Sequence, residues 1–207
     1  MKSGFVVVLI VFFFINSLLA QQSFKGIVKY KMTVIGASDG RTDSMKVVFG
    51  NNKIKTVFYL PSTKENNKVI TKSYIDNFTD NTTTDIDDEG RTYSITALNR
   101  DQLYKFTNTN KFDAVDNKLC FTFIADKADF DNNKYQKIEC LASVDFLYRG
   151  VLNYFFYGIQ PIVIDNRIVF DFTTTEKDGR KSKLFLYEIT AVEDVENEFS
   201  LKGMNVK

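Results

Sequence analysis

The side chains available for chemistry in this chain are carboxylates, hydroxyls, amines and two thiols, because the sequence contains no histidine. Without an imidazole, neither a Ser-His-Asp nor a Cys-His catalytic arrangement can form. The commonest ligand of zinc and copper is missing for the same reason. An enzyme would have to rely on carboxylates, Lys or Tyr. We therefore predict that the protein is not an enzyme and that it holds no metal or other cofactor.

Residues 85–90 resemble the start of a calcium loop, because oxygen side chains alternate and glycine stands at the sixth position. The matching residues are Asp85, Asp87, Glu89 and Gly90. The twelfth position, which should be Glu, is Thr96, and the flanking residues are typical of strands rather than of helices. A solvated acidic turn is favoured, and a weak calcium site is the alternative. A second acidic cluster lacks the glycine and comprises Asp126, Asp129, Asp131 and Asn133.

Four further carboxylates lie close to the C-terminus and have the residue types that glycosidases use: Glu193, Asp194, Glu196 and Glu198. A glycosidase needs one carboxyl group with a raised pKa and a defined separation from its partner across a cleft. Acidic residues that cluster near a chain end are usually exposed to solvent. We therefore expect no catalysis at this segment.

Aromatic side chains are concentrated between Phe146 and Tyr157, in a chain with 20 Phe and 10 Tyr. Ordinary core is the simplest interpretation of such a stretch. The functional alternative is the lining or lid of an apolar groove, in which tyrosine hydroxyls orient the ligand. The candidate groove residues are Phe146, Tyr148, Tyr154, Phe155, Phe156 and Tyr157.

The first twenty residues have the layout of a secretory signal peptide. Lys2 gives a positive start, residues 5–15 form an unbroken apolar run, and Ala20 is a small residue at the expected cleavage site. We predict cleavage after Ala20 and export of residues 21–207 to the periplasm or the extracellular space. An uncleaved anchor is the alternative, although the run is shorter than the roughly 20 residues that span a bilayer. No cysteine lies near the cut, so we expect no lipid attachment there.

Cys120 and Cys140 are the only cysteines, and their separation excludes a redox Cys-x-x-Cys motif. In an exported protein the default expectation for two cysteines is a disulfide. Such a bridge would stabilise the fold by about 3 kcal/mol in the chain-entropy treatment. Two free, buried thiols are the alternative.

The balance of charges argues against binding to nucleic acid, and the length of the chain is that of a single domain. Removing Lys2 with the signal leaves equal numbers of basic and acidic residues, so no net field would attract nucleic acid or an anionic membrane. A single domain commonly holds about 100–200 residues, which suits residues 21–207. No later stretch is long and apolar enough to span a membrane.

The elements that would position these side chains are mostly strands. In residues 24–34 apolar and charged side chains alternate, as in an antiparallel strand with one wet face. Turn residues at 50–52 and at 178–179 predict hairpins. The segments 118–124 and 134–141 are expected to be neighbours. Residues 143–157 fit either a short helix or a strand, and residues 197–207 are expected to be a frayed tail.

Three segments carry a resemblance to a known family: Phe24–Met32 (FKGIVKYKM), Val47–Lys55 (VVFGNNKIK) and Gly90–Ile95 (GRTYSI). They resemble the uncharacterised bacterial envelope proteins grouped near the lipoprotein carriers LolA and LolB, including the GLPGLI-type secreted proteins. The segments 137–140 and 157–161 are loose echoes of the GLPGLI pattern, whose signature itself is absent.

The resemblance implies a mainly β fold: a single antiparallel, strongly curved sheet, or half-barrel, with a few short helices over its concave face. In the carriers that face holds acyl chains, which implies a lipid or a lipidated peptide as ligand of this protein. The alternative function is an interaction or assembly module of the cell envelope, which binds a protein partner through an edge strand or the acidic loop.

Overall fold

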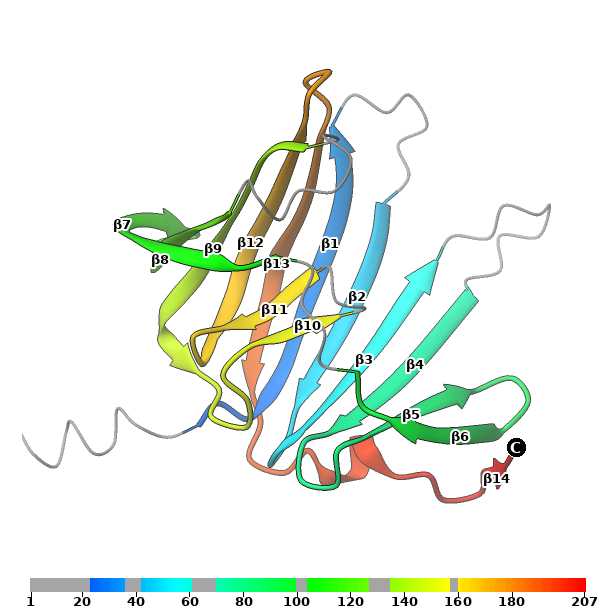
Figure 1. Cartoon of the computed structure of the whole chain (residues 1–207). Helices are drawn as coiled ribbons and strands as arrows, with labels where there is room; N and C mark the ends of the chain where they lie inside the picture. The colour runs from blue at the N-terminus through cyan, green and yellow to red at the C-terminus, as the bar shows by residue number, and fades with distance from the viewer. Residues whose placement is uncertain (1–22, 36–41, 61–69, 100–103, 127–134, 157–159) are drawn as a thin grey trace, which may run out of the picture.

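The computed structural model describes residues 23–35, 42–60, 70–99, 104–126, 135–156 and 160–207 (Figure 1). The predicted signal segment, Tyr157 and most of the second acidic cluster lie outside these ranges. One short 3₁₀ helix, η3, covers Glu196–Phe199. The strands are β1 (Gly26–Ile35), β2 (Thr42–Phe49), β3 (Lys53–Leu60), β4 (Ile70–Asn77), β5 (Thr82–Asp87), β6 (Thr92–Ala97), β7 (Phe106–Val115), β8 (Lys118–Ala125), β9 (Tyr135–Leu147), β10 (Tyr154–Phe156), β11 (Gln160–Ile164), β12 (Arg167–Glu176), β13 (Lys181–Ala191) and β14 (Asn205–Val206).

The strands form one large open sheet in the order β14-β6-β5-β4-β3-β2-β1-β13-β12-β9-β8-β7, with β10 and β11 attached through β12. The prediction of a mainly β protein with few short helices is confirmed, and η3 is the single helix among the described residues. The prediction of a purely antiparallel sheet is wrong in one place, because β14 pairs with β6 in parallel. The strong curvature of a half-barrel was also predicted wrongly, since the sheet is open and only moderately curved (Figure 1).

Asn, Asp and Gly place the tight turns where the sequence predicts them. Asn52 adopts φ +52° between β2 and β3, and Gly179 adopts φ +88° between β12 and β13. Both angles lie in the left-handed region that these residue types tolerate best. The predicted hairpins at 50–52 and 178–179 are therefore confirmed.

The alternation along β1 separates the two faces of the sheet. Val28 and Tyr30 are fully buried on one face, here called the inner face, whereas Lys29 and Lys31 lie on the other, the outer face. The Tyr30 hydroxyl donates a hydrogen bond to the Val169 carbonyl at 2.8 Å. The polar atom of this fully buried side chain therefore has a hydrogen-bond partner.

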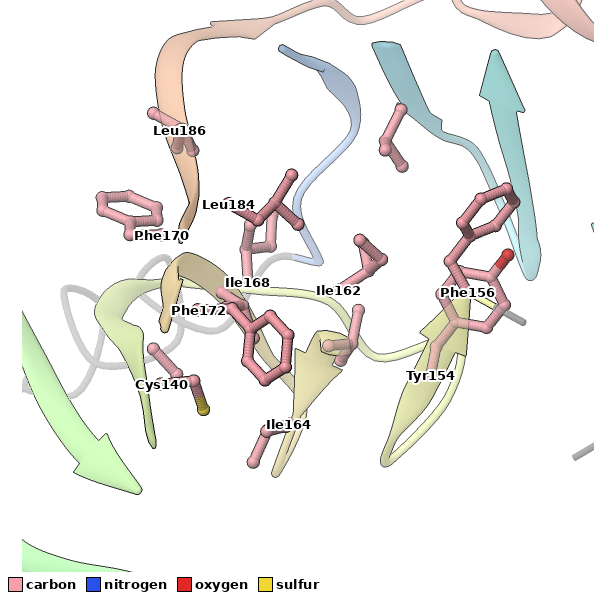
Figure 2. Close-up of a cluster of buried hydrophobic side chains, with 14 of the residues drawn as sticks. Cys140, Tyr154, Phe156, Ile162, Ile164, Ile168, Phe170, Phe172, Leu184 and Leu186 are labelled. Atoms are coloured by element: carbon pink, nitrogen blue, oxygen red, sulfur yellow. The ribbon is translucent and has the colours of Figure 1, made fainter. Parts of the chain in front are cut away.

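The hairpin formed by β10 and β11 lies across the inner face (Figure 1). Phe156 packs against Phe58 and Tyr74 of the sheet, with ring centroids 5.9 and 5.8 Å apart. Figure 2 shows apolar side chains of β10, β11, β12 and β13 gathered in one cluster. The core therefore lies between this hairpin and the sheet, and residues 143–157 divide into the end of β9, a connection and β10.

Residues 192–207 are here called the C-terminal strap. Its residues 197–207 are not the frayed tail that the sequence suggested, because they include part of η3 and all of β14. Val195 is buried, and Glu198 forms an ion pair of 2.8 Å with Lys46 on the outer face. Lys55 donates to the Glu198 carbonyl at 2.7 Å. The strap then ends in β14, so it spans the outer face from the end of β13 to β6.

Candidate functional site

A pocket of about 270 Å³ opens between the start of β7, the end of β8 and the β10–β11 hairpin. Five of its eight lining residues are apolar. The other three are two asparagines and one aspartate, here called the polar rim. The lining residues are Phe106, Asn108, Phe123, Leu152, Asn153, Phe155, Ile164 and Asp165.

The register of β7 and β8 builds one side of the pocket. Phe106 pairs with Ala125, and Asn108 pairs with Phe123, so both β7 residues alternate onto the face that Phe123 shares. The ring of Phe106 packs against Phe155 of β10 at a centroid distance of 5.9 Å. This contact joins the β7–β8 hairpin to the β10–β11 hairpin, and the pocket lies at their junction.

Leu152 lines the pocket and leaves 57% of its surface exposed to solvent. It belongs to the connection between β9 and β10, immediately before Asn153. A large exposed aliphatic side chain at the mouth of an apolar pocket supplies surface that a ligand can remove from water.

The polar rim is fixed by hydrogen bonds to the backbone. The Asn153 Oδ1 atom accepts a hydrogen bond from the Asp165 N–H at 2.9 Å, and the Asn108 Oδ1 atom accepts one from the Asn110 N–H at 2.8 Å. Asp165 begins the two-residue turn between β11 and β12, where it adopts φ +51°. The carboxamide oxygens are therefore occupied, whereas the Asp165 carboxylate stays 58% exposed.

Arg167 forms a long ion pair with this carboxylate, at 3.9 Å from Nε to Oδ2. Its Nη1 atom donates to the carbonyls of Ser143 and Val144 at 3.3 and 3.0 Å. The guanidinium also lies over the ring of Phe121 at 4.5 Å. Arg167 is thus engaged with β8 and β9 and does not line the pocket.

Of the candidate groove residues predicted from the sequence, Phe155 alone lines this pocket. Tyr148, Tyr154 and Phe156 are buried in the core, and Phe146 packs between Phe24 and Phe170. The Tyr148 hydroxyl donates to the Lys53 carbonyl at 3.1 Å. Tyr157 lies outside the described residues.

The sequence reasoning missed the other apolar lining residues: Phe106, Phe123, Leu152 and Ile164. A signal for Phe123 was present, because Leu119, Phe121 and Phe123 alternate along β8. No pattern in one sequence reveals that β7 and β10 meet, since this contact is formed by residues that are far apart in the chain.

Tyr154 and Asp76 form a buried polar pair beneath the β10–β11 hairpin. The Tyr154 hydroxyl donates to Asp76 Oδ2 at 2.5 Å, and the Thr83 hydroxyl donates to Oδ1 at 2.6 Å. Burial raises the pKa of Asp76 and raises the pKa of Tyr154 well above its usual value. Neither residue lines the pocket, so the pair anchors β10 to β4.

The acidic segments are engaged within the protein. Asp87 Oδ1 accepts the Gly90 N–H at 2.9 Å, and its Oδ2 atom lies 3.0 Å from Lys207 Nζ. Asp88 accepts a hydrogen bond of 2.8 Å from the Ser73 hydroxyl. In the part of the chain that the structure describes, no three His, Cys, Asp or Glu side chains gather as a metal site would require.

The predicted disulfide is not formed, because Cys120 and Cys140 are free, buried thiols. In the β8–β9 register, Cys120 lies opposite Ser143 and Cys140 lies opposite Phe123. The two cysteines are three positions apart, roughly 10 Å along the strands, and alternate onto opposite faces. A disulfide needs Cα atoms within about 7 Å, so this register excludes the bridge.

Comparisons with known proteins show a similarity of fold and no family membership. No family model and no curated protein matches the chain. Two crystal forms of PNGF-II are similar, with TM-scores of 0.52 and 0.50 at 10% and 11% identity. Each match covers 89% of this chain, which spans only about 30% of the length of PNGF-II.

Other similar structures include a LolA superfamily protein from Nitrosomonas europaea, with a TM-score of 0.36 at 11% identity. That match covers 87% of this chain and 90% of the other. The superfamily that the sequence resembles is therefore among the similar structures, at a score too low to carry an inference. Among the described residues, no helix has the length and apolar composition of a membrane span.

Proposed function

We propose that this protein is an exported, non-catalytic binding protein that takes an apolar group of its ligand into the pocket beside the β7–β8 hairpin. The observation that carries the proposal is the lining itself. Three phenylalanines, Leu152 and Ile164 surround a cavity with three polar side chains at its rim. This combination of apolar walls and a few polar groups is typical of small-molecule sites.

The resemblance of the sequence to the LolA-like envelope proteins supports a lipid or a lipidated peptide of the cell envelope as the source of that group. The size of the pocket supports entry of one chain or ring at a time. The signal-like segment at residues 1–20 supports export to the periplasm or beyond.

The first test is mass spectrometry of organic extracts from the full-length gene product, purified without detergent. A stoichiometric apolar molecule in the extract supports the proposal and identifies the ligand.

The second test is a fluorescence titration with 1-N-phenylnaphthylamine, which reports on apolar sites and suits a protein without tryptophan. We expect saturable binding that Leu152→Gln weakens about fivefold, as loss of about 1 kcal/mol of apolar burial predicts. The matched control is Ile95→Gln, because Ile95 is also 57% exposed and does not line the pocket. Folded protein with no saturable binding would contradict the proposal and favour the interaction module.

A further inference from the structure

We infer that the pocket selects a small amphiphilic cation, in which one short apolar group is joined to an ammonium head. The inference rests on the proposed function and specifies the chemistry of the ligand. It depends on three properties of the site: its volume, the sign of its charge and its aromatic faces.

The volume limits the apolar group to a single ring or a short chain. A cavity of about 270 Å³ lies just below the roughly 300–1,000 Å³ of sites that enclose drug-sized ligands. Of the long acyl chain of a lipid, only a short segment would enter, and the remaining methylenes would stay in water, where they add no affinity.

The charge of the site is negative where it faces the ligand. Asp165 is the only ionisable residue among those that line the pocket in the described part of the chain. The Nη1 atom of Arg167 donates to the Ser143 and Val144 carbonyls, and its Nε atom lies 3.9 Å from Asp165 Oδ2, where it offsets part of the negative charge. The Asp165 side chain is still 58% exposed, so a cationic head can reach its carboxylate, whereas an anionic head meets no cation among the lining residues.

The walls and the rim add to this preference. Phe106, Phe123 and Phe155 line the pocket, and aromatic rings attract a cation that reaches their faces through the ring quadrupole. The carboxamide oxygens of Asn108 and Asn153 already accept backbone hydrogen bonds. Their NH₂ groups remain for a neutral oxygen of the ligand, and Asp165 remains as the acceptor for its ammonium group.

The experiment compares alkylammonium ions with alkyl carboxylates of equal length, from four to twelve carbons, below their micelle-forming concentrations. Methyl NMR signals of Leu152 and Ile164 report binding. We expect hexylammonium to bind roughly two- to fivefold more tightly than hexanoate, the ratio that one exposed ion pair supplies. Beyond six to eight carbons the affinity should level off.

Two variants test whether Asp165 causes the preference for hexylammonium over hexanoate. Asp165→Asn should bring the hexylammonium-to-hexanoate ratio close to one, because asparagine tolerates φ +51° and the Asp165 N–H can still bond Asn153. The control is Asp116→Asn, since Asp116 and Asn117 form an equivalent turn between β7 and β8, with φ +48° and +62°. This variant should keep the wild-type ratio.

The outcomes separate the inference from the proposed function. Hexanoate binding as tightly as hexylammonium, an unchanged ratio in Asp165→Asn, or an affinity that rises about fourfold per methylene up to dodecyl would overturn the inference alone. If no probe shifts the Leu152 and Ile164 methyl signals, both the inference and the proposed function are wrong.

Discussion

Asp76 of β4 connects this strand to β10, because its carboxylate accepts a hydrogen bond from the Tyr154 hydroxyl. Burial raises the pKa of Asp76 above 3.8, and the hydrogen bonds from Thr83 and Tyr154 oppose this rise without cancelling it. A raised pKa in the folded state means that folding favours the protonated carboxyl group. This contribution to stability is complete below the unfolded pKa and is lost as the pH rises through the folded pKa.

The variant Asp76→Asn tests this direction of the pH dependence of stability, because asparagine stays neutral at every pH. We expect the free energy of unfolding of the wild type, relative to the variant, to fall as the pH rises from about 4 to 7. Urea unfolding across this range measures the difference. Asp178→Asn should show the opposite slope at lower pH, because a backbone hydrogen bond from Arg180 lowers the pKa of Asp178. The wild type, relative to this variant, should lose stability as the pH falls from about 5 to 2. A difference that does not change with pH would contradict the prediction.

A second prediction at the scale of single residues concerns the reactivity of the two cysteine thiols. Burial raises the pKa of Cys120 to about 11 and raises the pKa of Cys140 well above 9. Because the thiolate is the reactive form, both cysteines should react with a disulfide reagent at pH 8 far more slowly in native protein than in urea. Two thiols per chain should titrate after unfolding. An intact disulfide, seen as no free thiol in urea, would show that the register of β8 and β9 is wrong.

At the scale of elements, β7 shows how the sheet protects one of its edges. An unpaired edge strand can join strands of other molecules, and side chains or bulges can block such pairing. In β7 the N–H groups of Asn110, Lys111 and Ala114 are bound by the side chains of Asn108, Thr109 and Asp113. The irregular register between Asn108 and Phe112 interrupts the edge further.

Removing one of these contacts should expose the edge to self-association. We expect Thr109→Val to form oligomers at concentrations where the wild type is monodisperse, because valine cannot bind the Lys111 N–H and favours strands. The variant also loses the 2.9 Å hydrogen bond from the Thr109 hydroxyl to the Thr122 carbonyl of β8, which loosens the edge strand further. Size-exclusion chromatography with light scattering measures this change. Thr107→Val is the control, since it makes the same substitution in the same strand, at an exposed residue. Equal behaviour of both variants would contradict a protective role for Thr109.

At the scale of the whole molecule, the C-terminal strap connects distant parts of the sheet, and Phe199 sets how closely it approaches. A Cβ atom on Gly50 would lie 2.7 Å from the Phe199 ring. Gly50→Ala should therefore displace the strap and lower the free energy of unfolding by about 1–3 kcal/mol. Phe199→Ala should remove the clash, so the double variant should lose less stability than the two single changes predict together. Additive losses in urea unfolding would show that Gly50 and Phe199 do not interact.

Local patterns in the sequence predict the strands and turns but not the long-range arrangement. The alternation in residues 24–34 and the turn at Asn52 depend on neighbouring residues, so one sequence suffices to recognise them. The parallel pairing of β14 with β6 and the pocket between β7 and β10 depend on contacts between distant segments. The disulfide expectation was wrong for the same reason, because register decides whether two cysteines can meet.

The pairing of β1 with β13 also determines when this protein can fold. Lys29 and Glu188, which form an ion pair across these strands, are 159 residues apart in the sequence. A central strand cannot complete its pairing before nearly the whole chain has been synthesised, and closing so long a loop slows folding. During synthesis the chain therefore lacks its complete native sheet until residues 181–191 have been made, and the apolar side of β1 stays open to other contacts for that time.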